Sequence, residues 1–244
     1  RYIASGSQLG ITLKNTQSVP VGSLSIEHMY PMDFEEFLYA NGVGKAVLET
    51  IKNSFKNKEA LSDTLHSTML DFFKKYLLVG GFPKAVAEFL ESRNIVEVRK
   101  IQQEIHNMYD VDASKYEVEN NKKLKIRRIF DMIPSTLENK KKRVVIKDIE
   151  DKKWKRSDDY IDEFEYLISA GITLEVRAVS KPSYPLVENS GKNLLKLYLN
   201  DVGMLSRVYY KNSIKAVMSD VSSVNLGSVY ETAVAQELKA QGYN

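Results

Sequence analysis

Two runs of positively charged side chains are the groups in this sequence most suited to binding a ligand. Residues 122–156 contain 14 Lys and Arg against 5 Asp and Glu, whereas the whole 244-residue chain has a net charge of only +3. Concentrated positive charge attracts phosphate groups, although most such runs are simply a solvated face. The candidate contacts to a nucleic-acid backbone are Lys140, Lys141, Lys142 and Arg143 in the first run, and Lys152, Lys153, Lys155 and Arg156 in the second.

Two short stretches resemble a phosphate-binding loop but do not satisfy its pattern. The pattern G-x-x-x-x-G-K-[ST] places backbone amides around the phosphates and a hydroxyl on the metal ion. Gly44-Lys45 is followed by Ala46, and Gly191-Lys192 is followed by Asn193, so neither supplies the hydroxyl. Neither lies between a predicted strand and a predicted helix. We therefore assign no phosphate-binding loop.

Side chains suited to catalysis or metal binding are scattered along the sequence. His28, His66 and His106 are far apart, and none has a second ligand at a spacing that suits a metal. The chain has no cysteine and no G-x-S-x-G motif. The paired carboxylates at residues 35–36 and 158–159 fall at predicted helix starts, where the helix dipole favours them. We therefore assign no catalytic residue and no metal ligand.

The basic runs lie within an order of elements typical of a winged helix-turn-helix. Apolar positions at helical spacing predict a helix over residues 124–133, and a short helix follows at 144–149. A third helix is expected over residues 157–170. Two strands at 172–179 and 194–199 complete the pattern, joined by a Pro-containing loop in the place of a wing.

The third helix, which reads DNA in most winged-helix proteins, is acidic in this sequence. Outward-facing carboxylates would repel the phosphates of a DNA groove. We therefore expect the acidic helix 157–170 to contact a partner protein, and any DNA to be bound by the two basic runs. The side chains expected to face outward are Asp158, Asp159, Asp162, Glu163 and Glu165. Those expected to face inward are Tyr160, Ile161, Phe164, Leu167 and Ile168.

The remaining sequence predicts a mainly α protein with minor β-structure, in the α+β class. Short strands are expected at residues 2–4 and 25–30, followed by a capping box at residues 33–36. Residues 42–110 have the periodicity of a small all-helical module, and a last helix is expected over residues 229–240.

Local signals within the helical module mark where its helices begin. Ser62 and Asn94 are expected N-caps, and Pro83 suits the first turn of a helix. The apolar stripe of the helix before Ser62 is formed by Val47, Leu48, Ile51 and Phe55, and that of the helix after it by Leu65, Met69, Phe72, Phe73 and Tyr76.

The composition is ordinary for a soluble globular protein, with 43% hydrophobic and 27% charged residues. No apolar run approaches the roughly 20 residues that span a bilayer, so no membrane partner is expected. The absence of cysteine fits a reducing compartment, and we expect a cytoplasmic protein.

Seven short motifs occur in a single order along the chain. They are Ser5–Gly10 (SGSQLG), Ser18–Gly22 (SVPVG), Tyr30–Leu38 (YPMDFEEFL), Gly80–Pro83 (GGFP), Asp112–Tyr116 (DASKY), Lys196–Leu205 (KLYLNDVGML) and Gly227–Glu231 (GSVYE). In content and order they resemble bacterial and archaeal AAA-type ATP-binding proteins, in which an ATPase is followed by a winged helix and a restriction-nuclease-like domain of unknown function.

This resemblance implies four segments of a longer protein, cut at both ends. Residues 1–40 would be the C-terminal end of the ATPase core, 41–115 a helical lid-like module, 116–215 the winged-helix domain, and 216–244 the start of the nuclease-like domain. The longer protein is then expected to be an ATPase that binds ATP and magnesium. The present chain lacks the Walker A and Walker B motifs, so it is expected to be inactive and to bind neither.

The resemblance also implies roles for individual side chains. Ser5 and Ser7 would be nucleotide-sensor residues, and Glu231 would be the first acidic residue of the nuclease-like fold. Ser23 stands where the family usually has a basic residue, so no contact from this position to the phosphates is expected. The alternative function is a non-enzymatic winged-helix module that binds DNA or protein.

Overall fold

The structure is a computed structural model that describes residues 3, 25, 27–112, 120–139, 157–179, 183, 190–211, 213–219 and 225–243. Its contacts divide the chain into two compact units. We call residues 30–106 with 201–244 the helical unit, and residues 1–29 with 107–200 the hairpin unit. The described residues are mainly helical and contain one two-stranded antiparallel sheet, which confirms the predicted mainly α class with minor β-structure.

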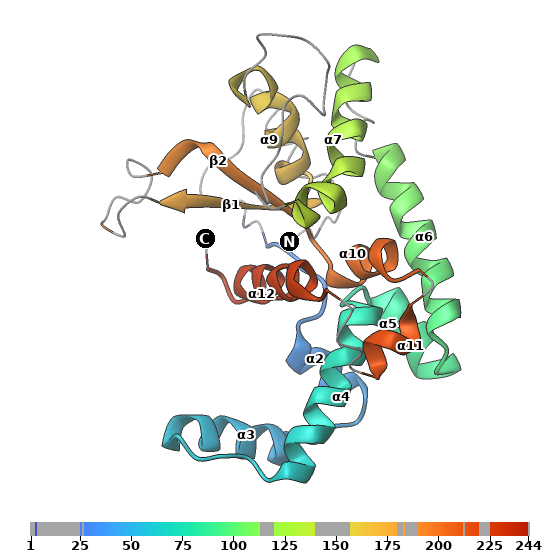
Figure 1. Ribbon diagram of the computed structural model, residues 1–244, viewed down its shortest axis with the longest axis vertical. Coiled ribbons are helices and arrows are strands. Elements are labelled where there is room, and N and C mark those ends of the chain that lie inside the picture. The colour runs from blue at the N-terminus through green and yellow to red at the C-terminus, as the bar shows by residue number, and fades with distance from the viewer. Residues whose placement is uncertain are drawn as a thin grey trace. The chain divides into compact units, whose positions relative to one another are not determined.

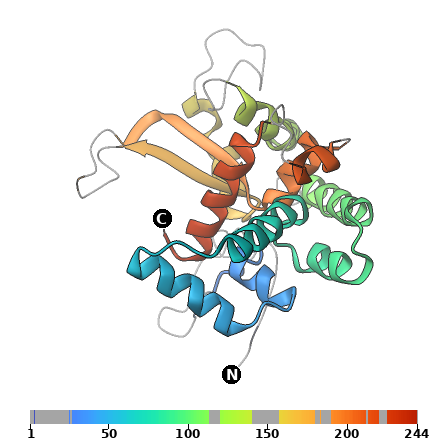
Figure 2. The same ribbon diagram turned by 60° about the horizontal axis from the view of Figure 1, so that its bottom comes forward.

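The helical unit is built around one central helix, α4 (Figure 1). Helix α4 contacts α2, α5, α10, α11 and α12, and Figure 2 shows it crossing α12. The helices of this unit are α2 (Phe34–Ala40), α3 (Lys45–Asn57), α4 (Asp63–Val79), α5 (Pro83–Ser92), the first part of α6 (Ile95–Asp112), α10 (Val202–Tyr209), α11 (Ile214–Met218) and α12 (Gly227–Ala240).

Three helix starts in this unit agree with the sequence prediction, whereas α10 and α11 have no counterpart among the predicted elements. Asp33 caps α2 by accepting from the backbone N–H of Glu36 at 2.8 Å, while the Glu36 carboxylate accepts from Asp33 N at 3.0 Å. Ser62 caps α4 through the N–H of Leu65 at 3.3 Å, and Pro83 is the first residue of α5. Caps of this kind each contribute about 1 kcal/mol.

The buried part of α4 differs from its predicted stripe. Only Tyr76 of that stripe is fully buried, and the fully buried segment is the last turn, 76–79. This turn is enclosed because the helices that contact α4 surround its C-terminal end. On α3 the predicted stripe is buried only at Leu48, and Phe55 is 85% exposed. The prediction that Phe55 belongs to a buried face is therefore wrong.

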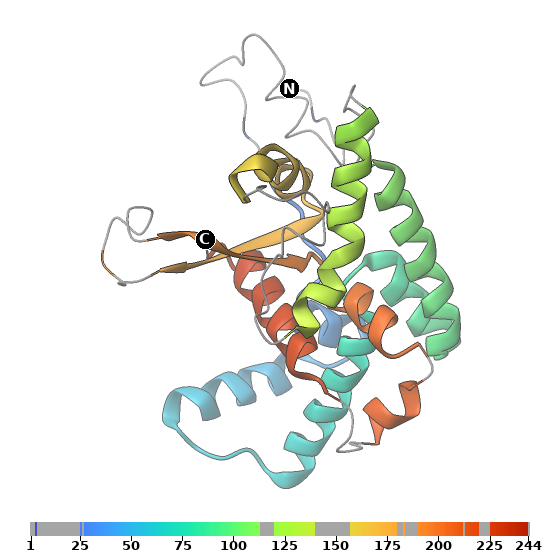
Figure 3. The same cartoon turned by 45° about the horizontal axis from the view of Figure 1, so that its top comes forward.

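The hairpin unit joins helices to the antiparallel hairpin of β1 (Thr173–Val179) and β2 (Ser190–Leu199). The strands pair in the register Thr173 with Leu199, which confirms the two predicted strands. Gly171, with a φ of +70°, ends the preceding helix, whose predicted last residue is 170. Helices α7 (Asn120–Glu138) and α9 (Ile161–Ser169) lie side by side, and both contact the hairpin (Figure 3).

The core of the hairpin unit lies between these helices and the hairpin. Helix α7 contributes Ile126, Ile129, Phe130, Ile133 and Leu137, all buried. Leu124, which the sequence places on the same face, is 61% exposed because it lies on the opposite side of α7. The predicted helix at 144–149 lies outside the described residues, so the winged-helix assignment stays a prediction.

The short strands expected near the N-terminus are not found among the described residues. Residues 27–30 form no strand, and Met29 is 98% exposed. Of residues 2–4 only Ile3 is described, and it is 95% exposed and not in a strand. The hairpin offers these residues no pairing, since the described sheet contains β1 and β2 alone. In the described part of the chain, no helix is both long and apolar enough to cross a membrane.

Candidate functional site

Most side chains that the sequence nominates for binding lie outside the described residues. This holds for the sensor candidates Ser5 and Ser7. It also holds for both basic runs, Lys140, Lys141, Lys142 and Arg143, and Lys152, Lys153, Lys155 and Arg156. Their roles stay predictions. Among the described residues no group of three or more His, Cys, Asp or Glu side chains could hold a metal ion.

Glu231 lies on α12, half-buried, in the part of the helix that also contains the buried Thr232 and Ala233. In the part of the chain that the structure describes, it belongs to no group of three or more possible metal ligands. Its assignment as the first acidic residue of a nuclease-like fold therefore stays a prediction.

The acidic helix differs from its predicted orientation at two positions. Glu163, expected to face outward, is only 4% exposed, and Ile161, expected to face inward, is 45% exposed. Tyr160, Phe164 and Leu167 are buried as predicted. Glu163 lies three positions after Tyr160 and four before Leu167, so it falls on the same side of the helix as these two buried residues. The prediction is therefore wrong for these two side chains.

Glu163 is buried against the basic start of α7. Its carboxylate lies 4.0 Å from Lys125 Nζ, and that ammonium group also lies 5.4 Å from the centroid of the Tyr160 ring. A second pair, between Lys122 and Asp162, has a distance of 3.6 Å. The basic face of α7 thus neutralises part of the acidic helix within the unit, which reduces the charge that either offers to an outside partner.

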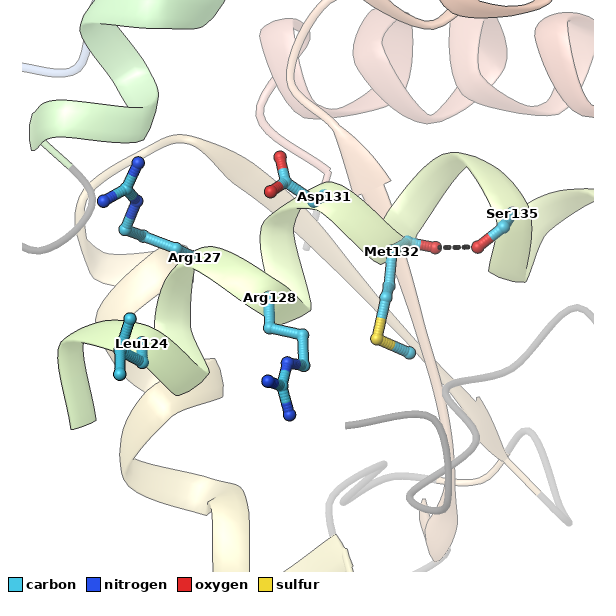
Figure 4. Close-up of a pocket in the computed structure, with 6 residues that line it drawn as sticks. All are labelled: Leu124, Arg127, Arg128, Asp131, Met132 and Ser135. Carbon is cyan, nitrogen blue, oxygen red and sulfur yellow. Dashed lines mark hydrogen bonds between the residues drawn. The ribbon is translucent and has the colours of Figure 1, made fainter. Parts of the chain in front are cut away.

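The outer face of α7 carries a shallow pocket of about 370 Å³ (Figure 4). The residues that line it repeat every three or four positions, so all lie on one side of the helix. They are Leu124, Arg127, Arg128, Asp131, Met132 and Ser135. Arg127 is held by a two-point ion pair with Asp110, with Nε 2.7 Å from Oδ1. Burial raises the pKa of Asp131, Asp110 raises it further, and Arg127 opposes both. The pocket has mixed charge and no nucleophile paired with a base.

Asp201 is fully buried in the helical unit and is surrounded by backbone N–H groups. It accepts hydrogen bonds from the backbone N–H groups of Gly81 at 2.6 Å and Met204 at 3.1 Å, and also from those of Phe82 and Gly203. Burial raises the pKa of Asp201 to about 6, and the four N–H groups oppose this shift. Asp201 therefore ties the start of α10 to the turn between α4 and α5.

Gly80 is required in this turn for two reasons. Its φ of 76° and ψ of −168° define a backbone conformation that is essentially restricted to glycine. A Cβ atom at this position would lie 2.7 Å from Asp201 Cγ, well inside van der Waals contact. Gly80 is thus explained by the close approach of the Asp201 carboxylate, and Gly81 by the backbone of Met32, with whose carbonyl oxygen a Cβ atom would collide.

A second set of buried polar groups continues from this turn to α12. Met32 N donates to the carbonyl oxygen of Gly81 at 2.8 Å, and the Tyr76 hydroxyl lies 2.9 Å from Met32 O. Gln236 donates to that hydroxyl at 2.9 Å and accepts from Val202 N, also at 2.9 Å. We call Asp201, Gly81, Met32, Tyr76 and Gln236 the polar core of the helical unit.

The polar core brings together three of the motifs singled out in the sequence. The stretches 30–38, 80–83 and 196–205 contribute Met32, Gly81 and Asp201 in turn. The sequence shows these motifs but not that they meet in space, because their members are up to 169 positions apart in the chain. The sequence signals that could have suggested this core are the glycine pair at 80–81 and the lone Asp201 in a polar turn.

These features define a helical module with a helix–hairpin unit, whose described residues contain no catalytic constellation. A family model described as a domain of unknown function (DUF8612) matches residues 70–218. The chain therefore belongs to the DUF8612 family. The matched range includes Gly81 and Asp201 but neither Met32 nor Gln236. No curated protein and no solved structure matches the chain.

Proposed function

We propose that this chain is the non-catalytic connector of an AAA-type ATP-binding protein. One observation supports the proposal above all. Three motifs of the resemblance, far apart in sequence, meet in one buried polar core and are bound to each other there. Motifs whose polar groups bind each other in a buried core hold helices in position and do not take part in catalysis. Such a role fits a cytoplasmic protein whose sequence has no cysteine.

The ATP and magnesium sites of the longer protein would then lie mainly outside this chain. The sequence contains no G-x-x-x-x-G-K-[ST] loop, and the sensor candidates Ser5 and Ser7 lie outside the described residues. The groups present therefore do not form a nucleotide site by themselves.

The direct test is titration with ATP and magnesium by isothermal calorimetry. The present chain should bind with a dissociation constant weaker than about 1 mM, which corresponds to about 4 kcal/mol. A chain extended upstream to include a Walker A loop should bind at least a hundredfold more tightly. If the extended chain does not bind ATP, the ATPase assignment is wrong.

The second candidate is a winged-helix module that contacts DNA or a protein. The observation in its favour is the helix–helix–hairpin arrangement of α7, α9 and the two strands. Charge reversal at Lys141, Lys142 and Arg143 should weaken DNA binding and reduce its dependence on salt. Neutralising Asp158, Asp159 and Asp162 should instead abolish capture of a protein partner. If DNA binding is absent or does not depend on salt, the basic run does not contact DNA. If capture of a protein partner is unaffected by neutralisation, the acidic helix is not the protein contact.

A further inference from the structure

Two arginines of the helical unit lie close together without a carboxylate. Arg99 on α6 and Arg207 on α10 are both half-buried. The described residues place no Asp or Glu side chain in an ion pair with either, and the charge that acts on Arg99 is that of Arg207. Charged side chains removed from water are ordinarily paired. This pair is therefore unusual.

Arg99 uses only one of its terminal nitrogens to hold the fold. Its Nη1 lies 3.3 Å from the carbonyl oxygens of Leu78 and Gly203, and 2.8 Å from Gln102 Oε1. Gln102, fully buried, also donates to the carbonyls of Leu78 and Val79. These contacts satisfy the last carbonyl groups of α4, as a basic side chain at a helix C-terminus does. The structural role of Arg99 therefore accounts for all the hydrogen bonds of its Nη1 atom described above.

The opposite edge of the Arg99 guanidinium has no such explanation. Nε and Nη2 of Arg99 are buried and have no acceptor within the described part of the chain. The same is true of Nε of Arg207, whose Nη1 donates to Gln103. Leaving a buried donor without an acceptor costs about 1–3 kcal/mol. Burial lowers the pKa of Arg99, the neighbouring Arg207 lowers it as well, and the two effects together bring it to about 10.

The unused donors have the geometry of an anion receptor. Nε and Nη2 of one guanidinium present two parallel N–H groups, which match two oxygens of a carboxylate or a phosphate. A second guanidinium beside the first supplies further positive charge, and a bound anion would remove the repulsion between them.

We propose that Arg99 and Arg207 together bind a small oxyanion, a phosphate or carboxylate group that engages the Nε–Nη2 edge of Arg99. Arg207 is the less deeply buried of the two. Because the unused donors of Arg99 are buried, binding requires the Arg207 side chain to turn aside and admit the anion. The site is independent of the proposed connector role, because it uses neither the polar core nor the sensor candidates.

The test uses the 244-residue chain in chloride buffer at constant ionic strength. Inorganic phosphate and sodium acetate are titrated separately by calorimetry, and thermal unfolding is followed in parallel. Binding of phosphate identifies a tetrahedral ligand, and binding of acetate alone identifies a carboxylate. The unfolding temperature should rise with the concentration of the anion that binds, because binding to the folded state stabilises it.

Arg207→Gln should lower the affinity at least tenfold. Without anion it should unfold at a higher temperature than the wild type, since the repulsion with Arg99 is removed. If Arg207 had only a structural role, its replacement would not both weaken anion binding and raise the unfolding temperature in the absence of anion. Lys100→Gln, which removes one charge from the next position of α6, is the matched control and should retain wild-type binding.

Two results would overturn the proposal. One is the absence of binding of both anions at millimolar concentration. The other is equal affinity in Arg207→Gln and the wild type. If Arg207→Gln does not fold, Arg207→Lys keeps the charge but loses the planar fork, and it should still bind at least tenfold more weakly.

Discussion

Replacing Gly80 by alanine tests the polar core directly. The added Cβ would lie 2.7 Å from Asp201 Cγ, so the carboxylate must move, and Gly80 would keep a φ of 76° that alanine disfavours. The backbone strain costs about 1–3 kcal/mol. Loss of one or two hydrogen bonds to the Asp201 carboxylate costs about 1.5–3 kcal/mol each.

The two effects together lower the free energy of unfolding by about 3–9 kcal/mol, against a total of about 5–15 kcal/mol for a typical domain. Urea denaturation followed by circular dichroism measures this change, and the unfolding temperature should fall by at least about 6 °C. Gly44→Ala is the matched control. Its Cβ would meet nothing within 4 Å and its φ is −72°, so we expect a change within about 0.5 kcal/mol.

A double-mutant cycle separates the collision from the strain. Asp201→Ala removes all three side-chain atoms that the added Cβ would approach, although it also removes the N-cap of α10. In that background Gly80→Ala should cost only the backbone strain, so the two substitutions should be coupled by at least about 1.5 kcal/mol. The reasoning fails if Gly80→Ala alone changes the stability by less than about 1 kcal/mol, or if the two changes are additive.

Three further predictions concern buried polar groups. Because the pKa of Asp201 is raised from 3.8 to about 6, the folded state binds a proton that the unfolded state releases. The free energy of unfolding should therefore fall by about 3 kcal/mol as the pH rises from about 4 to about 6, in urea titrations, and Asp201→Asn should flatten this slope. Tyr76→Phe removes the hydroxyl that lies 3.1 Å from Glu237 and should destabilise the protein by about 1–3 kcal/mol in the same assay, whereas no change would show that water replaces it. Lys125→Ala leaves the buried Glu163 without its counter-charge and should cost about 1–3 kcal/mol by thermal unfolding, a loss that Glu163→Gln in addition should largely restore.

The parts of the fold that the sequence predicts well are those determined by neighbouring residues. Asp33 and Glu36 form their capping box within one turn, and Gly171 ends a helix by its own backbone conformation. The burial of Glu163 could not be predicted, because the positive charge beside it comes from Lys125, which lies on a different helix. The exposure of Phe55 depends on whether another element covers it, which periodicity does not reveal.

The candidate sites were harder to predict because they are formed by distant residues. Asp201 and Gly81 are 120 positions apart, and each is unremarkable in its local context. Arg99 and Arg207 are likewise brought together only when α6 meets α10. No local pattern marks such pairs. A buried hydrogen-bond network is a property of the tertiary structure, and short motifs can only suggest which residues take part in it.

The division of the helical unit along the chain has a consequence for synthesis. The ribosome makes residues 30–106 first, then all of the hairpin-unit segment 107–200, and only afterwards the residues that supply Asp201 and Gln236. Until then the backbone N–H groups of Gly81 and Phe82 lack their acceptor, and the last turn of α4 lacks α10 and α12. The first half of the unit therefore cannot complete its fold until residues 107–200 have been translated and the last part of the unit follows them.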